Sequence, residues 1–116
     1  MKQILNQDVI WSRYELGTDF FNEYLVYFEE HADKIYKALN TQFQAREFEE
    51  MARSAHDLKG LCFNLGLEAY AEHLIMIERL AYNEVVEVLP AHIEQLPGLT
   101  KQAIAALVDY RTAQEG

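Results

Sequence analysis

The sequence predicts an all-α fold, an antiparallel four-helix bundle with a short additional N-terminal helix. Half of the 116 residues are hydrophobic, and only two prolines and five glycines interrupt the chain. Apolar residues recur at steps of three and four along most of it, which is the spacing of amphipathic helices. The connections between these helical patterns are short, and short connections favour antiparallel neighbours. A chain of this length forms one domain, residues 1–116, around a single core.

A short first helix is expected over residues 8–15, with Asp8 as its N-cap and Gly17 just beyond its end. Its apolar residues are Val9, Ile10 and Trp11.

A long second helix is expected to begin with Thr18 or Asp19 as its cap and to reach about Asn40. Residues 40–45 then form a turn. The apolar stripe of this second helix consists of Phe21, Tyr24 or Leu25, Phe28, Ala32, Ile35 and Leu39.

Residues 47–66 form the most regular helical pattern of the chain. At about 100° per residue, apolar side chains at steps of 3, 4, 3, 4 and 3 fall on one stripe. Gly66 suits the C′ position that closes this helix, because a left-handed backbone carries no Cβ penalty at glycine. The stripe consists of Phe48, Met51, Ala55, Leu58, Cys62 and Leu65.

Two further helical patterns complete the bundle, over residues 67–82 and 84–111. Pro90 is compatible with the first turn of a helix, whereas Pro97 is expected either to kink or to break the last element. Residues 111–116 are expected to form a frayed tail. The inward residues of the fourth helix are Tyr70, Leu74, Ile77 and Ala81.

The charge and composition exclude several classes of partner. The formal net charge of −9 argues against nucleic acid and against an anionic membrane surface, because both require a basic face. The one cysteine, Cys62, cannot form an internal disulfide, and its place on the apolar stripe favours a packed core thiol. The N-terminus lacks the apolar core of a signal peptide, and no apolar run reaches membrane-spanning length. A cytoplasmic location is expected.

The central helix presents an unusual outer face around His56. This side chain lies about 130° from the centre of the apolar stripe, so it should point toward solvent. Gly60 follows one turn later, where a glycine costs about 1 kcal/mol of helix stability relative to alanine. Arg53 and Lys59 add two cations, and Phe63 adds an exposed aromatic ring. Such a surface suits the docking of an anionic group, including a phosphoryl group on a nucleophilic imidazole nitrogen.

A metal centre is another possibility for a helical bundle that contains histidine. Di-iron bundles place a glutamate three residues before a histidine, and none of the four histidines has one. No His-x-x-x-His pair occurs either. The sequence also lacks a glycine-rich phosphate loop and a carboxylate pair suited to acid–base catalysis. We therefore predict neither a metal site nor a cofactor of the protein's own.

The segment Ala55-His56-Asp57-Leu58-Lys59-Gly60, followed by Asn64-Leu65-Gly66, resembles the signature of histidine-containing phosphotransfer (HPt) domains. That signature is His-x-Leu-Lys-Gly with a glycine ten residues after the histidine, as at Gly66. A weaker resemblance over residues 16–20 and 74–80 extends it over most of the chain. Leu61-Cys62-Phe63 is bulkier than the small residues that the family often has there.

The resemblance implies that His56 is the phosphoacceptor and that Lys59 lies beside the phosphoryl group and screens its charge. Gly60 would let the surface of a partner approach the imidazole. Gly66 has a structural role.

Three further residues of the central helix are predicted to contribute to docking. Arg53 can instead pair with Glu49 or Glu50 on its own helix. Phe63 can instead cover a helix junction, and Asn64 can simply help to end the helix. The second helix offers Tyr24, Tyr27, Glu30 and His31 as additional docking candidates.

The resemblance further implies a phosphorelay intermediate rather than an enzyme with ATP-dependent autokinase activity. The phosphoryl group would come from an aspartate of a receiver domain, often in a hybrid sensor kinase, and pass to the receiver of a response regulator. The Mg²⁺ for this transfer would belong to the receiver. The sequence leaves monomer and dimer open, and a monomer is the expectation. The main rival is a helical adaptor that binds a signalling partner without phosphotransfer.

Overall fold

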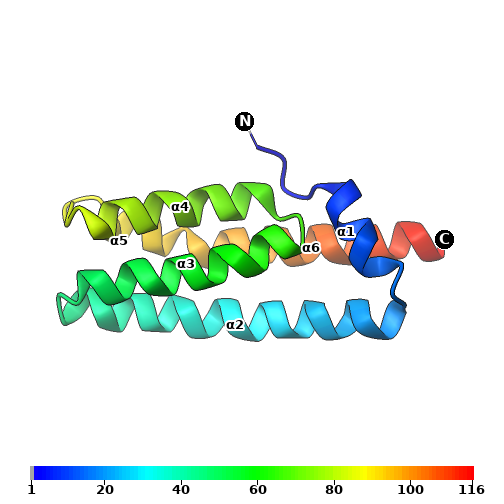
Figure 1. Ribbon diagram of the computed structural model, residues 1–116, viewed down its shortest axis with the longest axis horizontal. Helices are drawn as coiled ribbons and strands as arrows, with labels where there is room; N and C mark the ends of the chain where they lie inside the picture. The colour runs from blue at the N-terminus through cyan, green and yellow to red at the C-terminus, as the bar shows by residue number, and fades with distance from the viewer. Residues whose placement is uncertain (1) are drawn as a thin grey trace.

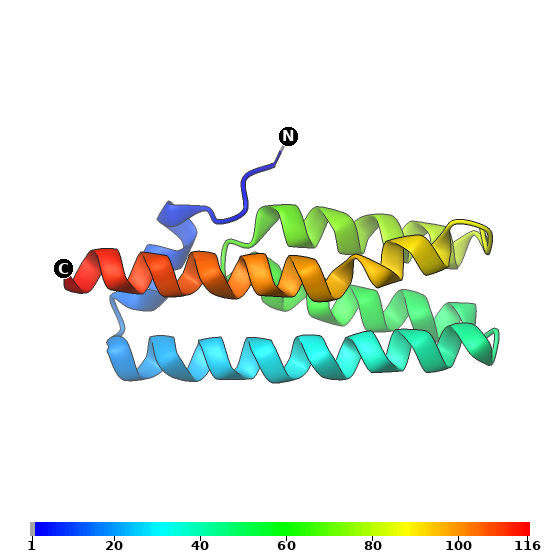
Figure 2. The same ribbon diagram turned by 180° about the vertical axis from the view of Figure 1, so that it is seen from behind.

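The computed structural model describes residues 2–116, and their fold is all-helical, as the sequence predicts. Four helices lie antiparallel in an elongated bundle of 47 × 26 × 19 Å, with one short helix across an end and another leading into the last helix (Figures 1 and 2). The elements are α1 (Gln7–Tyr14), α2 (Thr18–Gln44), α3 (Phe48–Asn64), α4 (Glu68–Tyr82), α5 (Leu89–Glu94) and α6 (Leu96–Glu115).

The predicted apolar stripes form the core of the bundle. All six stripe residues predicted for α3 and all four predicted for α4 are buried, and α3 and α4 share the most extensive helix–helix contact. In α2 the predicted residues are buried except Tyr24 and Leu25, which are half-buried. Cys62 is fully buried, and this burial raises the pKa of its thiol. No helix of residues 2–116 has the length and apolar character that crossing a bilayer requires.

Gly66, two residues beyond the end of α3, has the left-handed conformation that the sequence predicts, with φ of 73°. The Gly66 amide donates to the Phe63 carbonyl at 3.2 Å, and the Leu67 amide donates to the Cys62 carbonyl at 2.9 Å. This pair of bonds is the Schellman motif, which satisfies the last carbonyls of a helix. It turns the chain sharply, so α4 returns alongside α3.

We expect Gly66→Ala to destabilise the fold by about 1–3 kcal/mol, because alanine disfavours a positive φ. The new Cβ would also lie 2.7 Å from the backbone oxygen of Asn6, which must then move. Urea unfolding measures the loss. Gly98→Ala is the matched control, since a Cβ at Gly98 meets no atom within 4 Å and its φ is not positive. Equal stability of the two variants would contradict this account of Gly66.

α2 continues to Gln44 rather than ending near Asn40, so the turn predicted over residues 40–45 is wrong. The reversal occurs at Arg46, which has a positive φ of 59°. The extra turn packs Phe43 edge-on against Phe48 of α3, with ring centroids 6.4 Å apart. Burial of these rings offsets the cost of a left-handed arginine, which is about 1–2 kcal/mol.

α4 ends in the same way at Glu84, with φ of 54°. The Glu84 amide donates to the Ala81 carbonyl at 3.0 Å, and the Val85 amide donates to the Leu80 carbonyl at 2.9 Å. The chain therefore closes two helices with Schellman turns that contain no glycine.

The start of α1 also differs from the prediction. Asn6, not Asp8, is the N-cap, and its Oδ1 accepts the amides of Asp8 at 3.1 Å and Val9 at 3.3 Å. Of the three apolar residues predicted to pack, only Ile10 is fully buried, whereas Trp11 is largely exposed.

α2 begins at Thr18 with Gly17 as its N-cap and without a side-chain cap, so neither Thr18 nor Asp19 has the predicted capping role. At the other end of the chain, Gln95 separates α5 from α6, so the helix is broken rather than kinked. Pro90 and Pro97 each lie in a first turn. α6 continues to Glu115, which corrects the expected frayed tail.

Candidate functional site

His56 lies on the outer face of α3, beside α4. Its side chain is 63% exposed, as its angle to the buried stripe predicts. Its Nδ1 atom lies 3.1 Å from Oε2 of Glu78, which α4 contributes. The imidazole is therefore accessible to a partner and held on one side by the protein.

Glu78 joins His56 to Lys59. Its second oxygen, Oε1, accepts a hydrogen bond from Nζ of Lys59 at 2.9 Å. Lys59 is only 19% exposed and Glu78 27% exposed, so this ion pair is partly shielded from solvent. Partial shielding makes such a pair stronger than one on the open surface.

The pKa of Glu78 reflects opposing influences. Partial burial by itself raises the pKa, but the hydrogen bonds and positive charge from Lys59 and His56 outweigh it and lower the pKa below the ordinary value. Glu78 is therefore ionised at neutral pH and can only accept hydrogen bonds. In a neutral imidazole the proton must then reside on Nδ1, and Nε2 carries the free lone pair.

Gly60 and Phe63 leave the neighbouring surface open. A Cβ added at Gly60 would meet no atom within 4 Å, so the space one turn beyond His56 is empty. Phe63 is 52% exposed, so its ring does not serve mainly to seal a helix junction. Both features leave room for a partner's surface.

Arg53 and Asn64 already have intramolecular partners. Arg53 pairs with both Glu49, at 2.9 Å, and Glu50, at 2.6 Å, on its own helix. Both the backbone and side-chain oxygens of Asn64 accept hydrogen bonds from Arg13 of α1, at 3.1 and 3.3 Å. Asn64 thus ties the end of α3 to α1, and its docking role remains a prediction.

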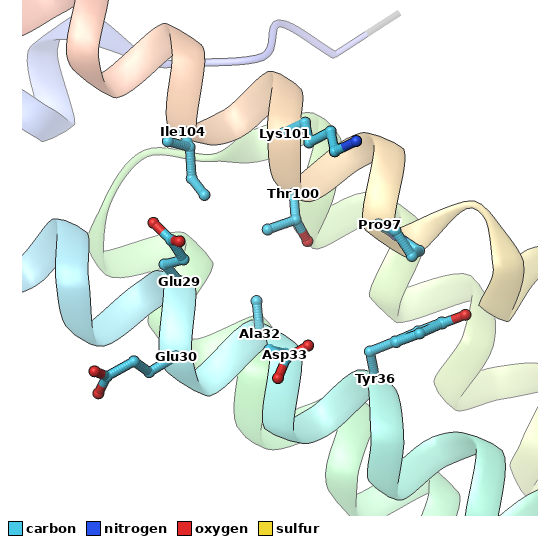
Figure 3. A pocket seen from close by; sticks show the side chains of 9 residues that line it. All are labelled: Glu29, Glu30, Ala32, Asp33, Tyr36, Pro97, Thr100, Lys101 and Ile104. Atoms are coloured by element: carbon cyan, nitrogen blue, oxygen red, sulfur yellow. The ribbon is translucent and has the colours of Figure 1, made fainter.

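The docking candidates on α2 lie within about two turns of that helix. Tyr27 is exposed and stacks on His31, with ring centroids 5.6 Å apart, and Tyr24 is half-buried nearby. Glu30 instead lines a groove of about 450 Å³ between α2 and α6 (Figure 3). The α2–α6 pair lies on the side of the bundle opposite the α3–α4 pair (Figures 1 and 2). The docking role of Glu30, like that of the other α2 candidates, remains a prediction.

The sequence analysis did not identify Glu78 as a site residue, although its spacing from Gly66 indicates that it lies opposite His56. His56 precedes Gly66 by ten residues and Glu78 follows it by twelve. Antiparallel helices joined at Gly66 bring such positions opposite each other, and Glu78 directly follows the buried Ile77 of the α4 stripe. No group of three or more His, Cys, Asp or Glu in residues 2–116 is placed to hold a metal ion.

The fold and this site together define a helical phosphotransfer domain, in which a bundle displays one exposed histidine next to a lysine. The sequence model of the family described as Hpt domain matches residues 23–109, which include every predicted site residue. The chain therefore belongs to the Hpt domain family. Members of this family are phosphocarriers rather than kinases, and they interact with receiver domains in phosphorelays. Comparisons with curated proteins and with solved structures give no match.

Proposed function

We propose that this protein is a phosphorelay intermediate in which His56 carries the phosphoryl group. His56 takes the group from the phosphoaspartate of one receiver domain and gives it to the aspartate of another. The observation that carries the proposal is the contact between Nδ1 and Glu78. This contact orients an exposed imidazole so that its proton lies on Nδ1, beside Glu78, and its free lone pair lies on Nε2.

The chemistry is a displacement at phosphorus. The Nε2 lone pair attacks the phosphorus in line, the new N–P bond forms, and the P–O bond to the aspartate breaks, which returns that carboxylate to its ionised form. The Nδ1 proton stays on the ring, now cationic, and its hydrogen bond to Glu78 stabilises that charge. The reverse displacement, by the carboxylate of the second receiver, regenerates neutral His56.

Lys59 supplies positive charge to the transferring group. Lys59 lies three residues after His56, and its hydrogen bond to Glu78 fixes the position of the ammonium before the phosphoryl group arrives. The Mg²⁺ that such a transfer uses is assigned to the receiver.

The proposed partners are the receiver domain of a hybrid histidine kinase and that of a response regulator. The same face must bind donor and acceptor in turn, so the interface is transient and of modest area. The protein acts as a monomer in this scheme and does not autophosphorylate with ATP.

The test is phosphoryl transfer from a panel of phosphorylated receiver domains to the purified protein. Label on a phosphohistidine is acid-labile and base-stable, whereas label on an aspartate is lost in base. A protein that binds a receiver tightly but takes no phosphoryl group from it would refute the proposal and favour the adaptor.

We expect Gly60→Glu to block receiver-mediated transfer by at least about 100-fold while leaving the fold intact. A side chain at this position enters open space within the protein, so the helix tolerates it. A docked partner would meet both the added volume and the added negative charge. Gly98→Glu on α6 is the control, since its Cβ also meets nothing within 4 Å but lies far from His56. Normal transfer by Gly60→Glu would show that the bare glycine is not a docking feature.

A further inference from the structure

Tyr82 is the most exposed large hydrophobic residue that the structure describes, at 76%. It is the last residue of α4 and lies four residues after Glu78, which places both side chains on one face of that helix. Nothing in the phosphotransfer chemistry uses it. A single exposed aromatic residue is ordinary on a protein surface, so the place of Tyr82 beside His56, and not its exposure alone, carries the argument.

Tyr82 and Glu78 stand between two hollows. The first has a volume of about 350 Å³, and Tyr82 and Glu78 line it together with His56, Arg53 and other residues. The second has a volume of about 390 Å³, and Tyr82 and Glu78 line it together with Lys59, Arg79 and other residues. The tyrosine ring is thus at the rim of the phosphoryl site, on the α4 side rather than the α2 side.

Arg79 gives this rim a positive charge. It is exposed, and within residues 2–116 its guanidinium makes no ion pair, whereas Arg53 is bound to two glutamates. An unpaired guanidinium on a chain with a formal net charge of −9 is suited to meet a carboxylate on a partner. Tyrosine and arginine are also the residue types most enriched among interface hot spots.

In-line transfer places strict limits on the docked geometry. The attacking Nε2 must come within about 3–3.5 Å of the phosphorus, opposite the P–O bond that breaks, so the partner's surface must lie directly over His56. A transient interface covers up to about 600 Å² on each partner, a patch roughly 28 Å across. Tyr82 shares a hollow with His56, so a receiver that fills this hollow contacts the tyrosine ring.

We propose that Tyr82 and Arg79 form an α4 anchor for the docked receiver domain, an inference that rests on the phosphotransfer function proposed above. The receiver covers the tyrosine ring with apolar side chains and presents a carboxylate to Arg79, next to its own phosphoryl aspartate. The anchor contributes to docking and not to the chemistry of transfer. It extends the contact surface beyond the second and central helices to which the sequence points.

The experiment compares two phosphodonors on the full chain. Phosphoramidate, a small donor, needs no docking, whereas the most active phosphorylated receiver of the panel does. For Tyr82→Ala we expect unchanged labelling by phosphoramidate and a second-order rate constant with the receiver lowered about 30-fold, the size of a hot-spot loss. The maximal first-order rate at saturating receiver should change less than about threefold.

Two controls separate the ring from its surroundings. Tyr82→Phe should transfer like wild type, since it keeps the ring, and Met76→Ala removes another exposed apolar side chain of α4 away from His56.

Arg79→Ala should lower the second-order rate constant about tenfold and weaken its dependence on salt.

Wild-type transfer from the receiver to Tyr82→Ala would overturn the anchor and leave docking to the α2 aromatics. Equal slowing with both donors would also overturn it, because Tyr82 would then shape the site itself. If neither donor labels His56 in the wild-type protein, the proposed function fails, which is a separate result.

Discussion

Replacing His56 with glutamine is expected to abolish phosphoryl acceptance from any donor while leaving the fold unchanged. A glutamine amide nitrogen has no available lone pair, so no N–P bond can form at this position. The His56 side chain is 63% exposed, so its removal leaves no cavity. Glu78 keeps its bond to Lys59, so the substitution strands no buried charge.

The measurement is labelling of wild type and His56→Gln by a phosphorylated receiver and by phosphoramidate, with helical circular dichroism recorded on both. His31→Gln is the matched control, because it removes a half-buried histidine of α2 whose ring stacks on Tyr27. We expect full labelling of the control by phosphoramidate, which needs no docking, and no labelling of His56→Gln by either donor. Acid-labile label on His56→Gln would mean that another histidine is the acceptor, and the site proposed here would be wrong.

The sequence sufficed to predict the fold and the exposure of His56 because both follow from local periodicity. The α3 stripe places Leu58 and Cys62 in the core, and the same geometry turns His56 outward. The role of Gly66 could be predicted equally well, since the residue that closes a helix with a Schellman turn needs a positive φ, which glycine adopts readily.

The end of α2 could not be predicted from the same rules, whereas the predicted end of α4 at Tyr82 is confirmed. Arg46 adopts the left-handed conformation that glycine or asparagine normally fills, so the sequence carries no stop signal there. Tertiary packing decides this position, as the contact of Phe43 with Phe48 illustrates. A rule that considers one helix at a time cannot predict such contacts between helices.

The α4 side of the site was missed for a related reason. Glu78 and Tyr82 look like an ordinary surface acid and a helix-terminal aromatic until α4 is placed against α3. The long-range contact gives Lys59 a partner that its own helix cannot provide, since Ala55 and Phe63 occupy the positions four residues away. The arrangement of this site therefore depends on the helix pair rather than on the motif of α3 alone.

Lys59→Ala is expected to slow receiver-mediated transfer by about 100-fold, the usual cost of removing one group that stabilises charge in a transition state. The effect has two possible origins, because Lys59 faces two anions. It neutralises the incoming phosphoryl group in the proposed mechanism, and it also neutralises Glu78, whose carboxylate would otherwise repel that group. The single variant loses both contributions.

A double-mutant cycle with Glu78→Gln separates the two origins. Glutamine keeps an acceptor oxygen for Nδ1 of His56 but carries no charge, so the orientation of the imidazole persists while the repulsion disappears. If Lys59 acts on the phosphoryl group, removing it from the Glu78→Gln background should still slow transfer at least about tenfold. If the double variant transfers as fast as Glu78→Gln alone, Lys59 serves only to neutralise Glu78. Urea unfolding of all four proteins shows whether any difference in rate reflects a loss of folded protein. We expect the Lys59 effect to persist, because Lys59 lies three residues after His56, within one helical turn, whether or not residue 78 is charged.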